Sequence, residues 1–144
     1  DLNQLVNTGG ARMTFEVGTQ LPEQVFYVDR ALLKQYADAS GDQNPIHQDE
    51  AFAKSVGLPD VIAHGMLSMA LVGQYVSEIA GSSAKVLEFG ARFTKPVIVP
   101  ADEKVDLTVT ATVAEIADGK ISLTLSATSA GVKVLGMAKA VVLQ

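Results

Sequence analysis

VIAHGMLSMALVGQYVSEIA, residues 61–80, is the longest apolar segment of the chain. It contains no Lys, Arg or Asp, and its only Glu stands at position 78. A helix that is apolar on nearly all its faces is normally buried on nearly all of them. The length would permit a membrane span, but His64, Gln74 and Glu78 interrupt the segment and no aromatic or basic belt flanks it. The segment therefore predicts a buried central helix with a sheet wrapped around it.

The second half of the chain shows the two-residue alternation of half-buried antiparallel strands. Apolar residues alternate with polar ones over residues 87–94, 104–113 and 121–128. Asp118-Gly119 is a strong hairpin signal between two of these runs. Ala130-Gly131 marks a turn before a last strand over residues 133–143. Residues 97–99 lie between two prolines and are predicted to be an edge or a crossover.

The first half of the chain is predicted to be mostly helical. Asp29 is a good N-cap for a helix over residues 30–40, and Asp49 caps a short helix over residues 50–56. Two short apolar runs before these helices are candidate strands, over residues 15–17 and 25–28. Helices followed by a meander of strands indicate an α+β fold, with one curved antiparallel sheet packed on the long helix.

The composition limits the class of protein. The 144 residues are about the size of one domain, and 48% hydrophobic with 19% charged residues can form a core. The net charge of −5 argues against nucleic acid, because phosphate binding needs clustered Lys and Arg. The absence of cysteine excludes disulfides and Cys-ligated zinc, and fits a cytoplasmic protein. Residues 1–12 are set aside as an extension or a cloning remnant, and residues 13–144 are predicted to be one domain.

A bend is predicted between the two short helices, in the sequence GDQNPIH over residues 41–47. Pro45 fixes its own φ and disfavours the α region for Asn44, so the backbone turns there. Such a turn can bring the side chains of Asp42 and His47 to the same small volume. A carboxylate and an imidazole in one volume can hold a water or pass a proton between them. This pair is the candidate catalytic site. The two histidines and the carboxylates show no metal-ligand spacing, so we expect no metal.

These residues lie in a longer string, YAxxSGDxNPIHxD over residues 36–49, which is followed by AHGM over residues 63–66. The two strings and their spacing resemble the MaoC-like, or hydratase 2, family of hot-dog-fold proteins. That family contains (R)-specific enoyl-thioester hydratases and (3R)-hydroxyacyl-thioester dehydratases. The resemblance covers most of the chain from about Met13 and implies a single hot dog. Within the family, the length and the helix sequence look most similar to the actinobacterial (3R)-hydroxyacyl-ACP dehydratases.

The resemblance implies that Asp42 and His47 are catalytic, and that the backbone N–H of Gly65 binds the thioester carbonyl. Adding or removing water next to a thioester builds negative charge on that carbonyl oxygen. The N-terminus of a helix offers free N–H donors and the positive end of the helix dipole, so it suits this role. Which of the two side chains takes which proton stays open.

Three further residues are candidate substrate contacts: Asn44, His64 and Met66. Each also has a structural interpretation, as a turn residue, a hydrogen-bonded core histidine and a core side chain respectively. Gly73 leaves room beside the predicted central helix, and we expect that room to admit a longer acyl chain.

The implied activity is the reversible hydration of an enoyl thioester, with no cofactor and with the substrate carried on CoA or on the phosphopantetheine of an acyl carrier protein. A hot dog leaves one sheet edge open, so we expect a homodimer or a heterodimer with a related hot-dog subunit. We expect no nucleic-acid or membrane partner. Two alternatives are an acyl thioesterase and a non-catalytic acyl-thioester-binding subunit. The lack of a carboxylate over residues 61–77 argues against the first, and the Asp42–His47 pair against the second.

Overall fold

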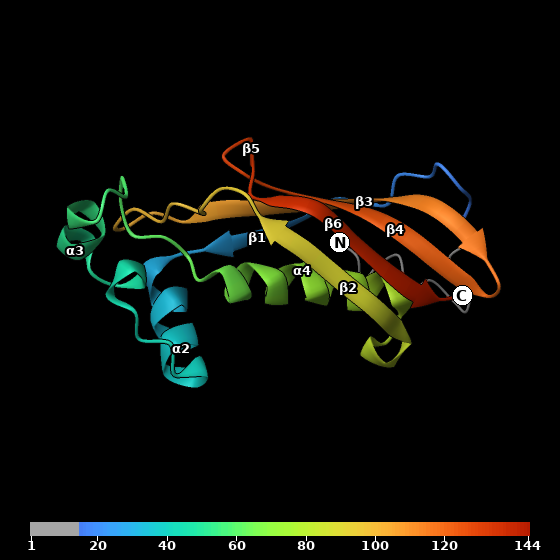
Figure 1. Cartoon of the computed structure of the whole chain (residues 1–144), viewed down its shortest axis with the longest axis horizontal. Helices are drawn as coiled ribbons and strands as arrows, with labels where there is room; N and C mark the ends of the chain where they lie inside the picture. Colours follow the sequence, from blue (N-terminus) through green and yellow to red (C-terminus); the bar gives the residue numbers. More distant parts are fainter. Residues whose placement is uncertain (1–14) are drawn as a thin grey trace.

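A curved antiparallel sheet lies over one long helix in the computed structural model, which describes residues 15–144 (Figure 1). The strand order is β1-β3-β4-β6-β2, and the short β5 pairs with β4. The helix, α4 (Gly65–Ala80), runs along one face of the sheet, while α2 (Arg30–Ser40) and α3 (Glu50–Ser55) lie near one end (Figure 1). The predicted α+β hot-dog architecture is confirmed.

The strands are β1 (Gln24–Val28), β2 (Val86–Phe93), β3 (Val105–Ala117), β4 (Lys120–Ser129), β5 (Val132–Lys133) and β6 (Leu135–Leu143). Two short 3-10 helices complete the described elements, η1 (Pro45–His47) and η2 (Ser83–Lys85). Among the described residues, no helix combines the length and the apolar character that crossing a membrane requires.

The core lies between α4 and the concave face of the sheet. Buried side chains recur at every second position of β3 and β4, as the alternation predicted. These are Leu107, Val109, Ala111 and Val113 on β3, and Ile121, Leu123, Leu125 and Ala127 on β4. From the helix, Val72, Tyr75 and Val76 have no exposed surface at all. A helix buried along this much of its length explains why its sequence carries so few polar residues.

The predicted caps and turns form for the expected physical reasons. The Asp29 carboxylate accepts a hydrogen bond from the Leu32 N–H at 2.8 Å, which satisfies a donor at the start of α2. Gly41 ends that helix with φ 80°. Asp118 and Gly119 have φ of 55° and 73°, and both join β3 to β4 in a two-residue hairpin.

Two predicted boundaries are wrong. Residues 15–17 do not form a strand, because the chain turns at Val17 and Gly18 and first pairs with β3 at Gln20, opposite Thr112. The last strand is split, since β5 pairs with β4 before β6 begins at Leu135. The predicted extension over residues 1–12 lies outside the described residues.

The central helix begins at Gly65 rather than four residues earlier, because residues 61–63 are held extended. The Ala63 N–H donates to the Val97 carbonyl at 2.9 Å, and the Val99 N–H donates to the Val61 carbonyl at 2.8 Å. Residues 97–99, predicted as an edge or a crossover, are therefore a crossover that pairs with the approach to α4.

β2 is an edge strand, and the burial of its side chains does not follow the simple two-residue alternation. It pairs only with β6, and its register shifts twice. Its apolar residues Leu87 and Phe93 are 44% and 57% exposed. β2 is one of the two edges of the sheet, and β1 is the other.

The Tyr75 hydroxyl links the central helix to the start of the sheet, and its loss should be measurable. It donates to the Pro22 carbonyl at 2.8 Å, and burial raises the pKa of Tyr75 to about 12, so it keeps its proton. Tyr75→Phe should lower the free energy of unfolding by about 1 kcal/mol, because a partly buried carbonyl loses its donor. Urea denaturation measures this, and equal midpoints for the two proteins would contradict it.

Candidate functional site

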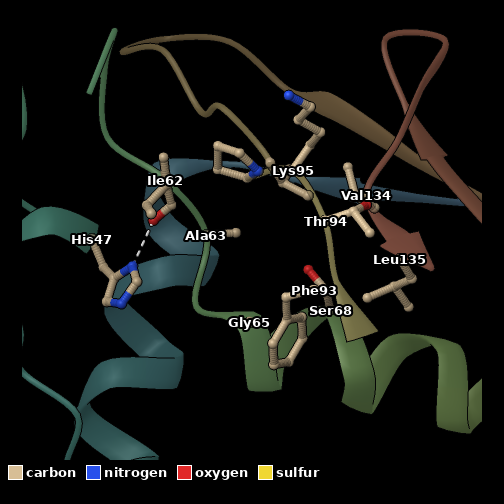
Figure 2. A pocket seen from close by; sticks show the side chains of 12 residues that line it. His47, Ile62, Ala63, Gly65, Ser68, Phe93, Thr94, Lys95, Val134 and Leu135 are labelled. Atoms are coloured by element: carbon tan, nitrogen blue, oxygen red, sulfur yellow. Dashed lines mark hydrogen bonds between the residues drawn. The ribbon is translucent and has the colours of Figure 1, made fainter. Parts of the chain in front are cut away.

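A cavity of about 310 Å³ opens at the start of α4 (Figure 2). It is lined mainly by apolar groups from the helix start, the crossover and the β5–β6 turn, namely His47, Ile62, Ala63, Gly65, Ser68, Phe93, Thr94, Lys95, Pro96, Val97, Val134 and Leu135. A second hollow of about 480 Å³ lies over β2, β3, β4 and β6 and contains neither histidine nor a helix start. The chemistry therefore points to the first.

The turn before the cavity is built by two short side chains. The Asp42 carboxylate accepts from the Asn44 N–H at 3.1 Å, and the Asn44 side chain accepts from the Ile46 N–H at 3.2 Å. Pro45 begins the 3-10 turn η1, where its missing N–H costs nothing. The predicted bend forms in this way and carries His47 to its end.

The extended segment over residues 61–63 fixes the orientation of His47. The backbone groups of Val61 and Ala63 hydrogen-bond to the crossover. The N–H and carbonyl of Ile62 therefore point away from the crossover. The Ile62 N–H donates to the Ile46 carbonyl at 3.2 Å, and the Ile62 carbonyl accepts from His47 Nδ1 at 2.7 Å. Because a carbonyl only accepts, Nδ1 carries the proton of the neutral ring. Nε2 of His47 is thus left as a proton acceptor.

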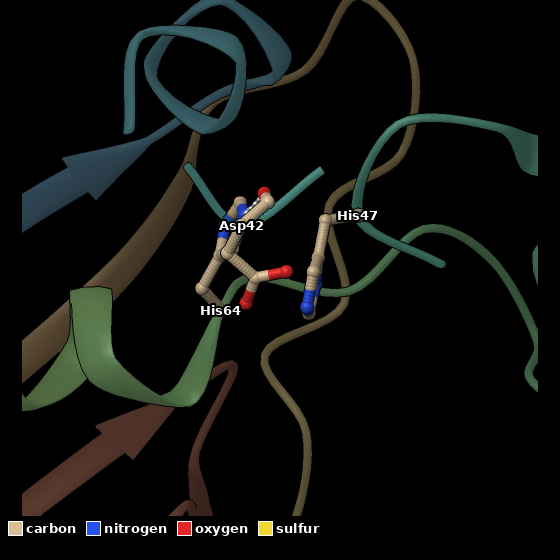
Figure 3. A group of neighbouring side chains, drawn as sticks. All are labelled: Asp42, His47 and His64. Carbon is tan, nitrogen blue, oxygen red and sulfur yellow. Dashed lines mark hydrogen bonds between the residues drawn. The ribbon is translucent and has the colours of Figure 1, made fainter. Parts of the chain in front are cut away.

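Asp42, His47 and His64 come together beside this cavity (Figure 3). Their nearest donor and acceptor atoms lie within 4.8 Å of one another. The Asp42 carboxylate points toward the His47 ring, and the pair shares no direct hydrogen bond among the described contacts. A single water can bridge a separation of this size. The arrangement can therefore hold a water between a carboxylate and a basic nitrogen.

His64 lies behind this pair and is only 1% exposed. Its ring stacks on His47 with 3.8 Å between centroids, and Tyr36 contacts it edge-on at 4.7 Å. His64 Nε2 donates to the Asp42 carbonyl at 3.2 Å, whereas its buried Nδ1 has no partner among the described residues. An unpaired buried acceptor costs about 1–3 kcal/mol. Burial lowers the pKa of His64, and the neighbouring His47 lowers it further.

Asp42, His47 and His64 each offer one possible ligand atom for a metal ion, and these atoms lie within 4.8 Å of one another. An imidazole binds a metal along the plane of its ring, and the His47 and His64 rings are stacked at 24° with their planes side by side. One nitrogen of each ring is already hydrogen-bonded to a backbone carbonyl. The nitrogens left without a hydrogen bond among the described residues are Nε2 of His47 and Nδ1 of His64, and they belong to two stacked rings. This stacking disfavours a tetrahedral zinc site, and the absence of a metal stays a prediction.

The start of α4 forms the other wall of the cavity. The first intrahelical bonds run from Leu67 and Ser68 to the His64 carbonyl, so the N–H groups of Gly65 and Met66 have no acceptor among the described residues. These N–H groups and the helix dipole favour a negative oxygen at this position. The Phe93 ring covers Gly65 closely, since a Cβ on that glycine would lie 2.9 Å from its Cζ atom.

The structure brings some of the predicted residues together and not others. His47 and Gly65 line the cavity, and Asp42 lies next to His47. Asn44 holds the turn through its side chain and is exposed outside the cavity lining. Met66 is 60% exposed and also lies outside that lining.

Most of the cavity lining lies outside the predicted catalytic and substrate-binding residues, and three of these additional residues carry chemical or steric weight. Ser68 follows Gly65 by three residues and so shares its helix face, a spacing that could have found it. Phe93 and Lys95 have no local signal, because the sheet brings them there. The space expected beside Gly73 is not empty: Phe89 fills it, with its Cε1 atom 3.4 Å from where a Cβ would stand. That part of the prediction is wrong.

His64 should make the free energy of unfolding depend on pH. Its pKa is lowered from 6.5 in the folded protein, so unfolding takes up a proton once the pH falls below 6.5. Stability should therefore decrease between about pH 7.5 and pH 5.5. Asp38 and Asp106, whose pKa values lie below 3.8, contribute little in this window. His64→Phe should flatten the dependence measured by urea denaturation, and an unchanged slope would argue against it.

Comparisons with known proteins agree with this geometry. A family model described as a MaoC like domain matches residues 12–131. The 3-hydroxyacyl-thioester dehydratase X of Mycobacterium tuberculosis is 39% identical over 80 residues, which are 56% of this chain and 28% of that protein. A solved MaoC-like dehydratase superposes with a TM-score of 0.87 at 36% identity, over 90% of this chain and 40% of the other. The R-hydratase PhaJ1 of Pseudomonas aeruginosa gives 0.76 at 30% identity, over 90% and 81%.

Proposed function

The chain belongs to the MaoC-like domain family, and from this premise we propose that it is a hydro-lyase of fatty acid metabolism. The proposed reaction is the reversible addition of water to a trans-2-enoyl thioester, which gives the (3R)-hydroxyacyl thioester. The thioester and the stereochemistry are supported by similarity to proteins named as a 3-hydroxyacyl-thioester dehydratase and an R-hydratase. The chain spans only 28% of the length of the 3-hydroxyacyl-thioester dehydratase. The activity of that longer protein is therefore assigned to this chain as a proposal.

One observation carries the proposal: a basic histidine, with a carboxylate beside it, lines the same cavity as the N–H groups of a helix start. His47 Nε2 and the Asp42 carboxylate can hold a water. The Gly65 N–H lies on the opposite wall, where a thioester carbonyl can accept from it. A donor of this kind is worth about 3–4 kcal/mol in the transition state of acyl chemistry.

Hydration in this cavity proceeds in two steps. The water oxygen bonds to C3 while His47 Nε2 takes one of its protons, and the electron pair of the double bond moves toward the carbonyl oxygen. The Gly65 N–H and the helix dipole stabilise that oxygen as it becomes negative. C2 of the resulting enolate then takes a proton back from the Asp42–His47 pair. Dehydration is the same path reversed, so neither direction is favoured by the geometry alone.

The thioesterase alternative lacks a catalytic carboxylate in the right place. The only acidic residue on α4 is Glu78, thirteen residues after Gly65. At 1.5 Å per residue the two are about 20 Å apart. The non-catalytic alternative is disfavoured because His47 lines the cavity and its Nε2 has no hydrogen-bond partner among the described residues.

We further propose a dimer formed through the open edge of the sheet. β2 presents unpaired backbone groups beside the exposed Leu87 and Phe93, which are features of a strand that pairs with another subunit. The partner is a second copy or a related hot-dog subunit. The proposed substrate carrier is CoA or an acyl carrier protein, and Lys95 at the cavity places a positive charge where its phosphate would pass.

The activity is tested by following the absorbance of short- and long-chain enoyl-CoA after the purified protein is added. Asp42→Asn and His47→Ala should each lower kcat by about 10²–10⁴-fold, as expected for the loss of an acid–base group. Asp102→Asn is a matched control, because Asp102 is exposed and its side chain makes no hydrogen bond or ion pair among the described residues. Turnover that appears only with a second hot-dog subunit would identify a heterodimer. Full activity in both site variants would overturn the assigned roles.

A methyl group at the helix start should block the carbonyl site. In Gly65→Ala the new Cβ would lie 2.9 Å from the Phe93 ring, so the ring or the helix start must move. We expect kcat to fall about 10²-fold, the cost of misplacing a reacting group by roughly 1 Å. Gly90→Ala is the control, since a Cβ there meets nothing within 4 Å. If Gly65→Ala and Gly90→Ala are equally active, the Gly65 N–H is not where the carbonyl binds.

A further inference from the structure

We propose that His64 is a positioning residue, which holds Asp42 and His47 in place against the start of α4 without touching the substrate. The inference rests on the proposed function for its kinetic consequences, and on the contacts alone for its structural ones. His64 is absent from the cavity lining, yet it contacts both members of the candidate pair.

Each face of His64 holds a different part of the site. Its Nε2–H donates to the Asp42 carbonyl at 3.2 Å and so restrains the backbone that carries the carboxylate. Its ring stacks on His47 at 3.8 Å and limits the tilt of that ring. His64 also immediately precedes Gly65, and its carbonyl accepts the first hydrogen bonds of α4. One side chain and its backbone therefore connect the turn, the basic nitrogen and the helix start.

Nδ1 of His64, which has no partner within residues 15–144, indicates why a histidine rather than an apolar ring stands at this position. Packing alone would be served better by an apolar ring, since Phe fills a similar volume and leaves no buried acceptor without a partner. The one polar interaction that a histidine adds here is the Nε2–H bond to Asp42. The Asp42 carbonyl lies in an exposed turn and could accept a hydrogen bond from water instead. The bond from His64 therefore contributes more to the position of the turn than to the stability of the fold.

The role requires His64 to stay neutral. The charged or titratable groups packed against it are Asp42 from the turn, His47 from η1 and Tyr36 from α2. A proton on Nδ1 would place a buried charge beside a His47 ring that itself becomes positive during the reaction. Burial lowers the pKa of His64, which favours its neutral form.

Three substitutions of His64 distinguish its hydrogen bond to the Asp42 carbonyl from its stacking on the His47 ring. His64→Phe keeps the stacked ring and removes the donor. His64→Gln keeps an N–H donor near the position of Nε2 and removes the ring. His64→Asn is the matched control for Gln, because its shorter amide lies near Nδ1, where no acceptor stands.

We expect kcat to fall about 10²-fold in His64→Asn and less in the Gln and Phe variants, each of which retains one contact. KM should change little in all three, because His64 does not line the cavity. His64→Phe should retain or exceed the wild-type melting temperature. Wild-type kcat in His64→Asn, a rise in KM alone, or kcat losses that simply follow losses of stability would each overturn the proposal.

Ring-nitrogen NMR tests the positioning without any turnover. The chain has two histidines, so the spectrum of His64→Asn contains the signals of His47 alone. Wild-type spectra should show protonated Nδ1 on His47 and protonated Nε2 on His64. His64→Asn should lower the Nδ1-protonated fraction of His47, and His64→Gln should lower it less. If wild-type protein fails to hydrate enoyl-CoA while these shifts appear, the proposed function fails and the positioning role stands. Unchanged His47 signals in His64→Asn would overturn the positioning role itself.

Discussion

The hydrogen bonds that hold residues 61–63 extended against residues 97–99 determine the rest of the site. They stop the apolar segment from becoming helical before Gly65, so the free N–H groups of α4 face a cavity. Because an extended chain alternates the direction of its backbone groups, the same segment leaves Ile62 free to bind the turn. Its carbonyl then sets the tautomer of His47. One short pairing thus places the donor for a negative oxygen and orients the base.

The sheet and the turn supply complementary parts. The sheet buries α4 on its inner side, which keeps the helix start rigid, and the crossover from β2 to β3 forms one wall of the cavity. The turn between α2 and α3 is held by its own short side chains and carries the carboxylate and the imidazole. Site residues on rigid elements are held more accurately than those on loops. In this fold the side chains of the turn are held in position because His64 and Ile62, next to the helix start, hydrogen-bond to the turn.

Much of this was predictable from local sequence. Asp29 and Gly41 define a helix by capping chemistry, Asp118-Gly119 defines a hairpin, and the apolar run over residues 61–80 identifies the central helix. The apolar run alone did not reveal where that helix starts, because the start depends on pairing with residues 97–99. Only the family resemblance placed Gly65 at the N-terminus of the helix. For the same reason Phe93 was not found: long-range folding, rather than spacing, brings it to the cavity. Phe89 beside Gly73 likewise shows that a glycine on a helix indicates close packing as readily as free space.

The central claim is that this cavity adds solvent water across a carbon–carbon double bond and leaves the thioester intact. The most direct measurement is mass spectrometry of the product formed from enoyl-CoA in ¹⁸O-labelled water and, separately, in D₂O. The account predicts ¹⁸O in a hydroxyl at C3 and one solvent deuterium at C2, on an unbroken thioester. Release of free thiol with ¹⁸O in a carboxylate would contradict it, because water would then have attacked the carbonyl that Gly65 is proposed to hold.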